Sequence, residues 1–334
     1  MIWKDKELIT IVVPTYNEEE NIKAVLRQLI SKNYDSEVIV VDGMSTDNTR
    51  KIVSGIAVEN PRIRMIDNPA RIQSIGVNLA AEQASQFSKY LLRADAHCDY
   101  PEGWVDNVVG SLTENGATSC VVPMLTVGKS GTQAAIAFAQ NSKLGNGGSS
   151  HRNSDAVSGW IDHGHHAIFL KEFFIASGGY DANFAVNEDA EFDLRTAKIG
   201  AKVWMNRDAV ITYYPRKTIH GLVGQYFRYG SGRAMTFWKH RTLPRLRQLM
   251  PAVATAGVAG SLLLGVLIDS RFLLIADMYF LLIAAYIFFV CGDRSTRFRV
   301  SVFLAMSAMH LSWGAGFLFQ LCRITIRDAL NRIQ

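Results

Sequence analysis

Three long apolar runs at the C-terminal end constrain the fold more than any other feature of this sequence. They cover residues 252–268, 272–292 and 300–322. Each approaches the ~20 residues that a helix needs to cross the hydrocarbon core of a membrane. Between Ala252 and Gly292 the only charged residues are Asp269, Arg271 and Asp277. The first two runs therefore predict a transmembrane hairpin that turns at residues 269–271, with buried core helices of a soluble protein as the alternative.

The third run has arginines at both ends. Arg294, Arg297 and Arg299 precede it, and Arg323, Arg327 and Arg332 follow it. Lysine and arginine are enriched on the cytoplasmic side of membranes. If the N-terminal domain is cytosolic, a third crossing would place three arginines outside. This run is therefore expected to span the membrane, or else to be tilted, re-entrant or interfacial.

Before residue 250 the pattern changes to short β-rich runs that alternate with helical periods. The β-rich runs are residues 8–13, 38–41, 63–66, 90–92 and 120–122. Strands separated by helices indicate βαβ units and a largely parallel sheet. In the helix after the first strand, Asn17 and Glu20 are placed as a capping box. We expect an α/β catalytic domain over residues 1–215, basic amphipathic helices over 216–250 and a membrane region with two or three transmembrane helices over 251–334.

The charge balance alone leaves the partner open. A net charge of +5 and a pI near 9.0 suit nucleic acid, a membrane surface or a phosphorylated metabolite. However, residues 216–247 hold eight Lys and Arg, no Asp or Glu, and five aromatic side chains next to the first apolar run. This pattern favours an interfacial helix over a nucleic-acid site. Because the charged N-terminus does not resemble a secretory signal, we expect a cytosolic catalytic domain at the inner (plasma) membrane.

Polar segments follow three of the predicted strands, at the edge where open parallel sheets bind ligands. They are residues 14–18 (PTYNE), 42–47 (DGMSTD) and 95–97 (DAH). GxGxxG and GxxxxGK[ST] are absent, so neither a dinucleotide fingerprint nor a P-loop is predicted. Asp42 is placed to accept from a nucleobase N–H or a ribose hydroxyl, or to cap a turn before Ser45.

Taken together, these motifs resemble the family 2 glycosyltransferases of the GT-A fold in order and spacing. The segments that carry the resemblance are VVPTYNEEENI, VIVVDGMSTDNT, RIQSIGVNL, LLRADAH, GGYDANF and NEDAEFDLR. With the membrane segments, the chain is most similar to the succinoglycan-type exopolysaccharide glucosyltransferases, which extend a polyprenyl-diphosphate-linked sugar. The resemblance implies a mixed, largely parallel sheet, a UDP-sugar donor, a lipid-linked saccharide acceptor, a divalent metal (Mn²⁺ or Mg²⁺) and inversion at the anomeric carbon.

The resemblance also implies roles for individual positions. Those placed around the nucleotide are Pro14, Thr15, Tyr16, Glu18, Asp42, Arg71 and Asp95. The metal falls at Asp95 and His97, where histidine replaces the second aspartate of the usual Asp-x-Asp motif. An imidazole nitrogen suits Mn²⁺ better than Mg²⁺ without excluding either. Alternatively, His97 is a hydrogen-bonded neighbour of a metal held by Asp95 and the diphosphate alone.

Displacement at an anomeric carbon needs a base that takes the proton of the acceptor hydroxyl. Glu188 and Asp189 are the candidates, although acidic residues at a helix start often only complement the helix dipole. In the family the aspartate of this pair is the base, so the resemblance assigns catalysis to Asp189. Glu188 is then an acceptor-site candidate.

Two further segments supply candidate contacts. Residues 225–229 (QYFRY) resemble the Gln-x-x-Arg-Trp motif of membrane-embedded polysaccharide synthases, which implies donor-diphosphate or acceptor contacts for Gln225, Arg228 and Tyr229. An interfacial helix with a snorkelling arginine is the alternative. A polar cluster contains the acceptor-site candidates Trp160, Asp162 and His163, followed by His165 and His166. Its His-x-His spacing suits a metal site, a sugar pocket or a plain surface loop.

The sequence therefore predicts a membrane-anchored inverting transferase that moves a hexose, with glucose the expected sugar, from a UDP-sugar to a polyprenyl-diphosphate-linked acceptor. Its partners are the donor, the lipid-linked acceptor and the membrane, with no nucleic acid. Rival hypotheses are a polyprenyl-phosphate sugar synthase, a processive synthase and a catalytically silent sugar-nucleotide-binding membrane scaffold. Three apolar segments make a poor channel for a processive synthase, and the presence of Asp42, Asp95 and Asp189 argues against the scaffold.

Overall fold

The computed structural model describes residues 8–29, 35–129, 131–147 and 157–331. The chain packs as two compact units, which are Met1–Leu125 with Ser150–Tyr213, and Thr126–Ser149 with Tyr214–Gln334. Residues 126–149, which the sequence analysis assigned to the catalytic domain, thus pack with the C-terminal helices.

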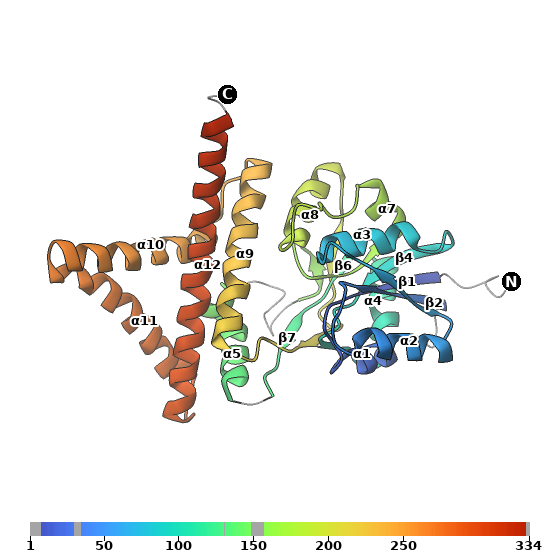
Figure 1. Ribbon diagram of the computed structural model, residues 1–334, viewed down its shortest axis with the longest axis horizontal. Coiled ribbons are helices and arrows are strands. Elements are labelled where there is room, and N and C mark those ends of the chain that lie inside the picture. The colour runs from blue at the N-terminus through green and yellow to red at the C-terminus, as the bar shows by residue number, and fades with distance from the viewer. Residues whose placement is uncertain (1–7, 30–34, 130, 148–156, 332–334) are drawn as a thin grey trace. The chain divides into compact units, whose positions relative to one another are not determined.

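An eight-stranded sheet organises the first unit (Figure 1). Its spatial order is β3 (Ile63–Asp67), β2 (Asp35–Asp42), β1 (Leu8–Thr15), β4 (Ser88–Arg93), β9 (His166–Leu170), β6 (Ser119–Val121), β10 (Val203–Met205) and β8 (Gly159–Trp160). β3, β2, β1 and β4 are parallel neighbours, whereas β9 runs antiparallel to both β4 and β6. The expected mixed, largely parallel sheet is confirmed, and strands occur at all five predicted β-rich runs.

Helices cover both faces of this sheet. α1 (Ile22–Gln28), α2 (Thr49–Glu59) and α4 (Trp104–Glu114) lie on one face, and α3 (Gln73–Gln83), α7 (Lys171–Ala176) and α8 (Glu188–Thr196) on the other (Figure 1). Alternation along β1 explains both layers, because successive strand residues point to opposite faces. Ile11 and Val13 pack in the cluster that contains Leu26 and Val108, while Val12 packs with the aromatic residues around α8.

The predicted capping box of Asn17 and Glu20 is wrong. α1 begins at Ile22 with Asn21 as its N-cap. Asn17 adopts a left-handed conformation with φ 54°, and its side-chain oxygen accepts from the backbone N–H of Thr46 at 2.8 Å. The segment after β1 therefore bonds to the segment after β2 rather than to its own helix.

Three short strands form a second, smaller sheet. Their order in this sheet is β5 (Cys98–Asp99), β11 (Ile211–Tyr213) and β7 (Met124–Thr126).

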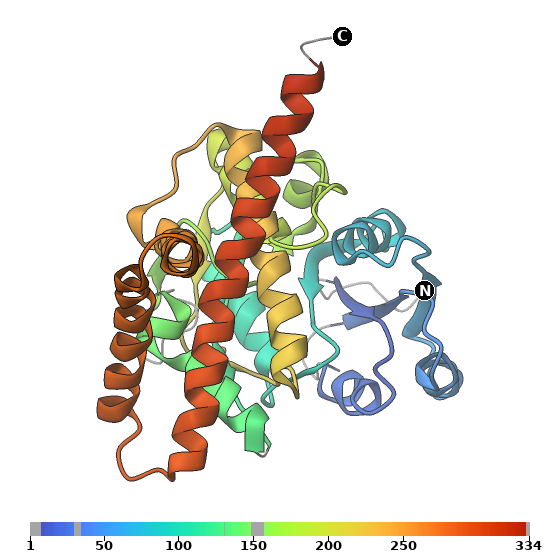
Figure 2. The same cartoon turned by 60° about the vertical axis from the view of Figure 1, so that its left-hand side comes forward.

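The second unit is helical. Its main helices are α5 (Gly131–Asn141), α6 (Lys143–Asn146), α9 (Ile219–His240), α10 (Leu246–Leu267), α11 (Leu274–Val290) and α12 (Thr296–Asn331). α9 and α12 lie side by side in both views, and α10 and α11 form a hairpin (Figures 1 and 2). Ile136 of α5 is fully buried in a cluster with Leu222 of α9 and Val302 of α12. Three segments, Leu246–Leu267, Ser270–Val290 and Thr296–Asn331, are long and apolar enough to cross a membrane.

Candidate active site

The parallel register of β1 and β2 places Thr15 directly beside Asp42 at the carboxyl edge of the sheet. Asp42 is completely buried. Its Oδ2 accepts from the backbone N–H of Ser45 at 2.9 Å and from Nη1 of Arg50 at 2.6 Å. Its Oδ1 has no partner among the described residues. A buried acceptor left unpaired costs roughly 1–3 kcal/mol, so this oxygen is a natural position for a ligand donor.

Tyr16 and Arg71 lie at the same edge. The Tyr16 ring is about half exposed, and the guanidinium carbon of Arg71 is 5.6 Å from its centroid. That separation suits a cation–π contact. Arg71 has a φ of 57°, one of several non-glycine left-handed residues in the strand-end loops. The structure thus brings Pro14, Thr15 and Tyr16 at the end of β1 close to Asp42, with Arg71 over the tyrosine.

His97 pairs with Glu18. Its Nδ1 is 3.2 Å from Oε1 of Glu18, and its ring meets the Tyr213 ring edge-on at 5.4 Å. Glu18 also accepts from Nδ2 of Asn21 at 2.8 Å. The imidazole predicted to bind metal therefore contacts a carboxylate other than Asp95 in this conformation, and its metal role stays a prediction.

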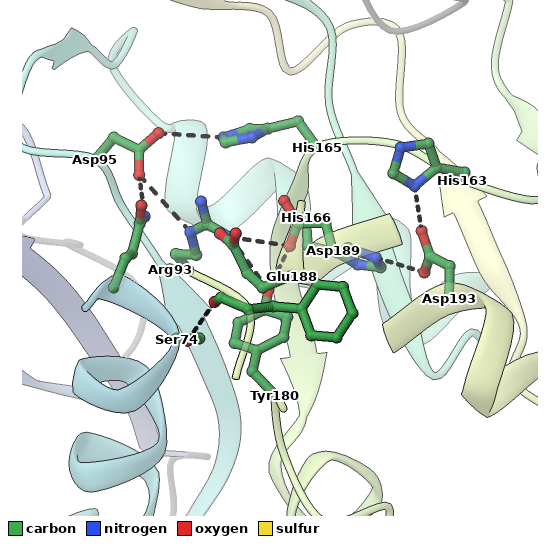
Figure 3. Close-up of polar contacts among 12 residues, drawn as sticks. Ser74, Arg93, Asp95, His163, His165, His166, Tyr180, Glu188, Asp189 and Asp193 are labelled. Carbon is green, nitrogen blue, oxygen red and sulfur yellow. Dashed lines mark hydrogen bonds and ion pairs between the residues drawn. The ribbon is translucent and has the colours of Figure 1, made fainter. Parts of the chain in front are cut away.

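Asp95, just beyond β4, uses its two oxygens differently (Figure 3). Oδ1 accepts from Nε2 of Gln73 at 3.1 Å and lies 3.7 Å from Nε of Arg93. Oδ2 faces Nε2 of His165 at 3.6 Å. Burial opposes ionisation, but the charges of Arg93 and then His165 prevail and lower the pKa of Asp95 to about 2. Burial lowers the pKa of His165 to about 4 despite this carboxylate.

At neutral pH, Asp95 is therefore an anionic carboxylate facing a neutral imidazole. Both are forms that bind divalent cations. Two ligands at about 2.1 Å from one ion lie roughly 3 to 3.6 Å apart, so the Asp95–His165 separation fits a shared cation better than a hydrogen bond. Within the described ranges, no group of three His, Cys, Asp or Glu side chains is arranged to hold a metal. A metal here would need further ligands from the substrate.

A buried ion cluster joins β4 to the start of α8 (Figure 3). Nη1 of Arg93 is 2.9 Å from Oδ1 of Asp189 and 3.3 Å from Oε1 of Glu188. The hydroxyl of Tyr180 donates to the same Asp189 oxygen at 2.5 Å. Both carboxylates lie in the first turn of α8, where the helix dipole favours negative charge.

The two carboxylates of this pair differ in proton affinity. Burial is the largest influence on both and favours the neutral acid. For Asp189, Arg93 outweighs burial, and the pKa is lowered. For Glu188, burial prevails over Arg93, with the charge of Asp189 adding to it, and the pKa rises to about 7. Asp189 is therefore the ionised partner, ready to accept a proton.

The turn before α8 is fixed to α3. Ser74 Oγ donates to the Phe184 carbonyl at 2.8 Å, and Asn78 bonds to both backbone groups of Tyr180. Gly179 has a φ of 63°, and a Cβ there would come 2.5 Å from the Asn78 side chain. Gly178 has a φ of 83°, so a left-handed backbone favours glycine at both positions of the Gly-Gly sequence. Asp181 caps this turn, since its Oδ1 accepts from the Asn183 N–H at 2.8 Å.

The histidines of the His-x-His motif have separate partners. Nδ1 of His163 is 2.6 Å from Oδ2 of Asp193, and Nε2 of the fully buried His166 is 2.7 Å from Oδ1 of Asp193. Burial opposes the charge on Asp193, but His166 and His163 prevail and lower its pKa to about 2. This cluster attaches α8 to the first residue of β9 and to the segment before it, whereas His165 faces Asp95. The HxH pair thus does not converge on one site.

The other predicted acceptor contacts are scattered. Trp160 is 56% exposed and packs edge-on against Trp204 at 5.0 Å, and Asp162 is exposed. In the second unit, Nε2 of the buried Gln225 donates to the Tyr229 hydroxyl at 3.0 Å. Arg228 on the same helix is exposed. Their predicted roles remain proposals.

Sequence reasoning missed Arg93, Tyr180 and the Asp95–His165 pair. One signal was available, because Arg93 ends an apolar strand two residues before Asp95, and a charged side chain at the end of a buried strand usually needs an ionic partner. Tyr180 was visible only as a turn residue. The pairing of His165 with Asp95 depends on β9 running antiparallel beside β4, which the sequence alone did not reveal.

Comparison with known proteins gives a consistent result. The model of the family described as "Glycosyl transferase family 2" matches residues 10–178. The succinoglycan biosynthesis protein ExoA of Rhizobium meliloti (strain 1021) is 43% identical over 309 residues, covering 92% of this chain and 93% of that protein.

Two more distant proteins are also similar. A Methanococcus voltae protein, named dolichyl N-acetyl-alpha-D-glucosaminyl phosphate 3-beta-D-2,3-diacetamido-2,3-dideoxy-beta-D-glucuronosyltransferase, is 25% identical over 69% of this chain and 74% of its own. The structure of the Pyrobaculum calidifontis mannosyltransferase PcManGT, in complex with GDP-Man and Mn²⁺, shares the fold with a TM-score of 0.56 at 19% identity. It covers 94% of this chain and 86% of that one.

Proposed function

This chain belongs to glycosyl transferase family 2 and is a glycosyltransferase, and from that premise we propose its donor, acceptor and mechanism. It moves a hexose, with glucose the leading candidate, from a UDP-sugar to a polyprenyl-diphosphate-linked acceptor during exopolysaccharide synthesis. Transfer inverts the anomeric carbon. The observation that carries the proposal is the Asp189 carboxylate, held ionised by Arg93 in the same cluster as Asp95 at the carboxyl edge of the sheet.

The donor nucleotide binds where β1 and β2 end. The unpartnered Oδ1 of Asp42 accepts from the nucleobase or the ribose, in line with its complete burial. Tyr16 offers a half-exposed ring for stacking, and Arg71 lies beside it with a charge that suits phosphate. Thr15 and Glu18 complete the expected contacts with the uridine and its ribose.

The residues present fit a divalent cation, Mn²⁺ or Mg²⁺. Asp95 would hold it through Oδ2, with an imidazole from His165 or, after release from Glu18, from His97. When bound, such a cation neutralises charge on the diphosphate leaving group. The manganese in the mannosyltransferase structure belongs to that protein and shows only that the fold accommodates a metal.

Asp189 acts as the base. Its free oxygen takes the proton of the acceptor hydroxyl while the hydroxyl oxygen forms a bond to the anomeric carbon and the bond to the UDP oxygen breaks. Arg93 and Tyr180 hold the other oxygen in place. Glu188, with a pKa of about 7, is available as a neutral hydrogen-bond donor to the acceptor.

The acceptor and location are inferred from the relatives and from the helical unit. One relative is named for succinoglycan biosynthesis, and another is named for a dolichyl-linked sugar phosphate. The apolar helices of the second unit give this chain a means of reaching such lipids. We assign Gln225, Arg228 and Tyr229 to the donor diphosphate and the acceptor sugar, and the chain to the inner membrane with its catalytic unit cytosolic.

A donor-by-acceptor screen of the detergent-solubilised full chain tests the proposal. UDP- and GDP-hexoses are offered with a polyprenyl-diphosphate-linked saccharide or a polyprenyl monophosphate, and the products are analysed for anomeric configuration. Inverted transfer from UDP-glucose to the diphosphate-linked saccharide is expected. Transfer only to the monophosphate would establish a polyprenyl-phosphate sugar synthase instead. Nucleotide binding without any transfer would establish the silent scaffold.

A further inference from the structure

We infer that α12 lies along the membrane surface together with α9, and that only the α10–α11 hairpin crosses the bilayer. This inference rests on the proposed membrane attachment. It concerns the second unit alone, and it identifies the partner of the α9–α12 face as the interfacial zone of an anionic lipid bilayer.

α9 and α12 are joined along most of the length of α9. Leu222 packs with Val302 near the start of both helices, and Phe237 packs on Phe317 further along. Between these points Ser231 Oγ donates to the Gly316 carbonyl at 3.0 Å. The two helices therefore run in the same direction, in close contact (Figures 1 and 2).

The backbones approach closely at glycines. A Cβ at Gly230 would overlap the backbone of Trp313, and one at Gly316 would overlap the backbone of Phe227. Neither helix can slide along or separate from the other without losing this fit. Wherever α12 lies in a membrane, α9 must lie at the same depth.

This constraint makes a third crossing energetically unfavourable. If residues 300–322 spanned the hydrocarbon core, the centre of α9 would lie beside Trp313 and Phe317, near the bilayer midplane. α9 carries Arg228 and Arg233 there, and Arg228 is exposed. Each arginine at the centre of a spanning helix costs about 2.5–3.5 kcal/mol. At the interface, water and phosphate groups surround an arginine side chain, and this cost does not arise.

The α10–α11 hairpin differs from α12 in burial and in direction. In an apolar 18-residue stretch of each segment, 17% is buried in Leu246–Leu267 and in Ser270–Val290, against 44% in Thr296–Asn331. At 1.5 Å per residue, α10 is about 33 Å long, which matches the ~30 Å hydrocarbon core. The first part of α10 crosses α12, where Thr255 Oγ donates to the Leu311 carbonyl at 3.2 Å. Beyond this contact α10 runs away from α12 in Figure 1, and in Figure 2 α10 is seen end-on while α12 extends across the view. A bilayer crossed by α10 therefore has α12 near its plane.

Two further features of α12 agree with an in-plane position. Arginines flank both ends of its apolar run, and an in-plane helix keeps all of them on one side, as the positive-inside rule favours. Arg332 lies outside the described residues. The large apolar side chains that α12 leaves exposed are Val300, Leu304, Phe319, Ile326 and Leu330, several of them four residues apart, as on one face of a helix. Such a stripe inserts into the boundary between headgroups and acyl chains.

Cysteine labelling tests the inference on the full chain in its native membrane. Ser270→Cys marks the hairpin turn, Ser295→Cys the start of α12 and Thr325→Cys its far end. All are made in a Cys322→Ser background, because Cys98, Cys120 and Cys291 are buried. A membrane-impermeant maleimide is applied to sealed cells and to inverted vesicles. Ser295→Cys and Thr325→Cys should react only from the cytosolic side, and Ser270→Cys only from outside.

The outcomes separate the two claims. Reaction of Thr325→Cys from the outside would show that α12 crosses, and would overturn the inference while leaving the membrane attachment intact. Reaction of Ser270→Cys only from the cytosol would overturn the hairpin itself.

A depth measurement gives an independent check. Nitroxides attached at Leu304→Cys and Phe319→Cys should both report shallow positions in the same leaflet. A nitroxide at Leu282→Cys on α11 should report a deep one and serves as the matched control. Opposite leaflets for the first pair would again refute the in-plane helix.

Discussion

Nη1 of Arg93 lies 2.9 Å from Oδ1 of Asp189, with both side chains largely buried. This contact links the strand that leads to Asp95 with the helix that carries the proposed base. Arg93 also lies near Glu188, so one guanidinium faces two carboxylates whose pKa values shift in opposite directions. Its charge lowers the pKa of Asp189 and keeps that side chain ionised, while burial raises the pKa of Glu188 to about 7.

Replacing the proposed base should separate catalysis from donor binding. Asp189→Asn keeps shape and hydrogen-bonding reach but cannot take the acceptor proton, so kcat should fall by roughly 10²- to 10⁴-fold. UDP affinity, measured by calorimetry, should survive. Asp208→Asn at the surface is the matched control and should leave both unchanged. Normal turnover in Asp189→Asn with an inactive Glu188→Gln would move the base to Glu188.

The pH profile identifies the base without mutation. A base must be deprotonated, and the lowered pKa of Asp189 leaves it ionised throughout the range from pH 8 to 6. We therefore expect kcat/KM to stay flat on the acid side of pH 7. A fall of about tenfold per pH unit below 7 would indicate Glu188, whose pKa is about 7.

Asp42→Asn should weaken binding of the donor nucleotide and leave the rate of the chemical step unchanged. The amide offers one acceptor oxygen in place of two, and its NH₂ group would face either the ligand or the donors Ser45 and Arg50. We expect UDP affinity to fall by about tenfold or more, consistent with ~1.5–3 kcal/mol for a charged hydrogen bond. Unchanged affinity in calorimetric titration would remove Asp42 from the nucleotide site.

Metal dependence distinguishes the two candidate imidazoles. EDTA should abolish transfer, Mn²⁺ should restore it best, and Asp95→Ala should remain inactive. Mn²⁺ binding in the presence of UDP, followed by electron paramagnetic resonance, should weaken by ~10-fold or more for whichever of His97→Ala and His165→Ala removes a ligand. Full turnover in chelator would refute the metal altogether.

The cluster of Asp193 with His163 and His166 should matter for stability. Removing one partner of a buried pair costs about 3–5 kcal/mol, so Asp193→Asn should unfold at clearly lower temperature than wild type in detergent. The pKa of Asp193 is depressed to about 2 from ~3.9 in an unfolded chain. Its stabilisation is therefore complete above pH 4 and disappears as the pH falls through 2, and the gap to Asp193→Asn should narrow over that window.

Much of the fold followed from local pattern. The β-rich runs predicted the strands because burial on both faces of a sheet leaves few polar positions, and the strand ends predicted where Thr15, Asp42 and Asp95 gather. The pairing of side chains across the site could not be predicted from the sequence. Asn17 bonds to the neighbouring loop rather than capping its helix, and His97 turns to Glu18, because loop geometry decides between several satisfactory partners. Long-range pairs such as Asp95–His165 depend on strand order.

The chain leaves the first unit at residue 126 and returns to it at residue 150, which limits how the protein can be divided. The chain passes between its two units three times, at residues 125/126, 149/150 and 213/214. Cutting the chain near residue 215 would remove the helices that bury Ala135, Ile136 and Ala139, and would leave an exposed apolar face on the N-terminal fragment. Each unit is thus built from two separate stretches of sequence, and no single cut in the chain yields both units intact.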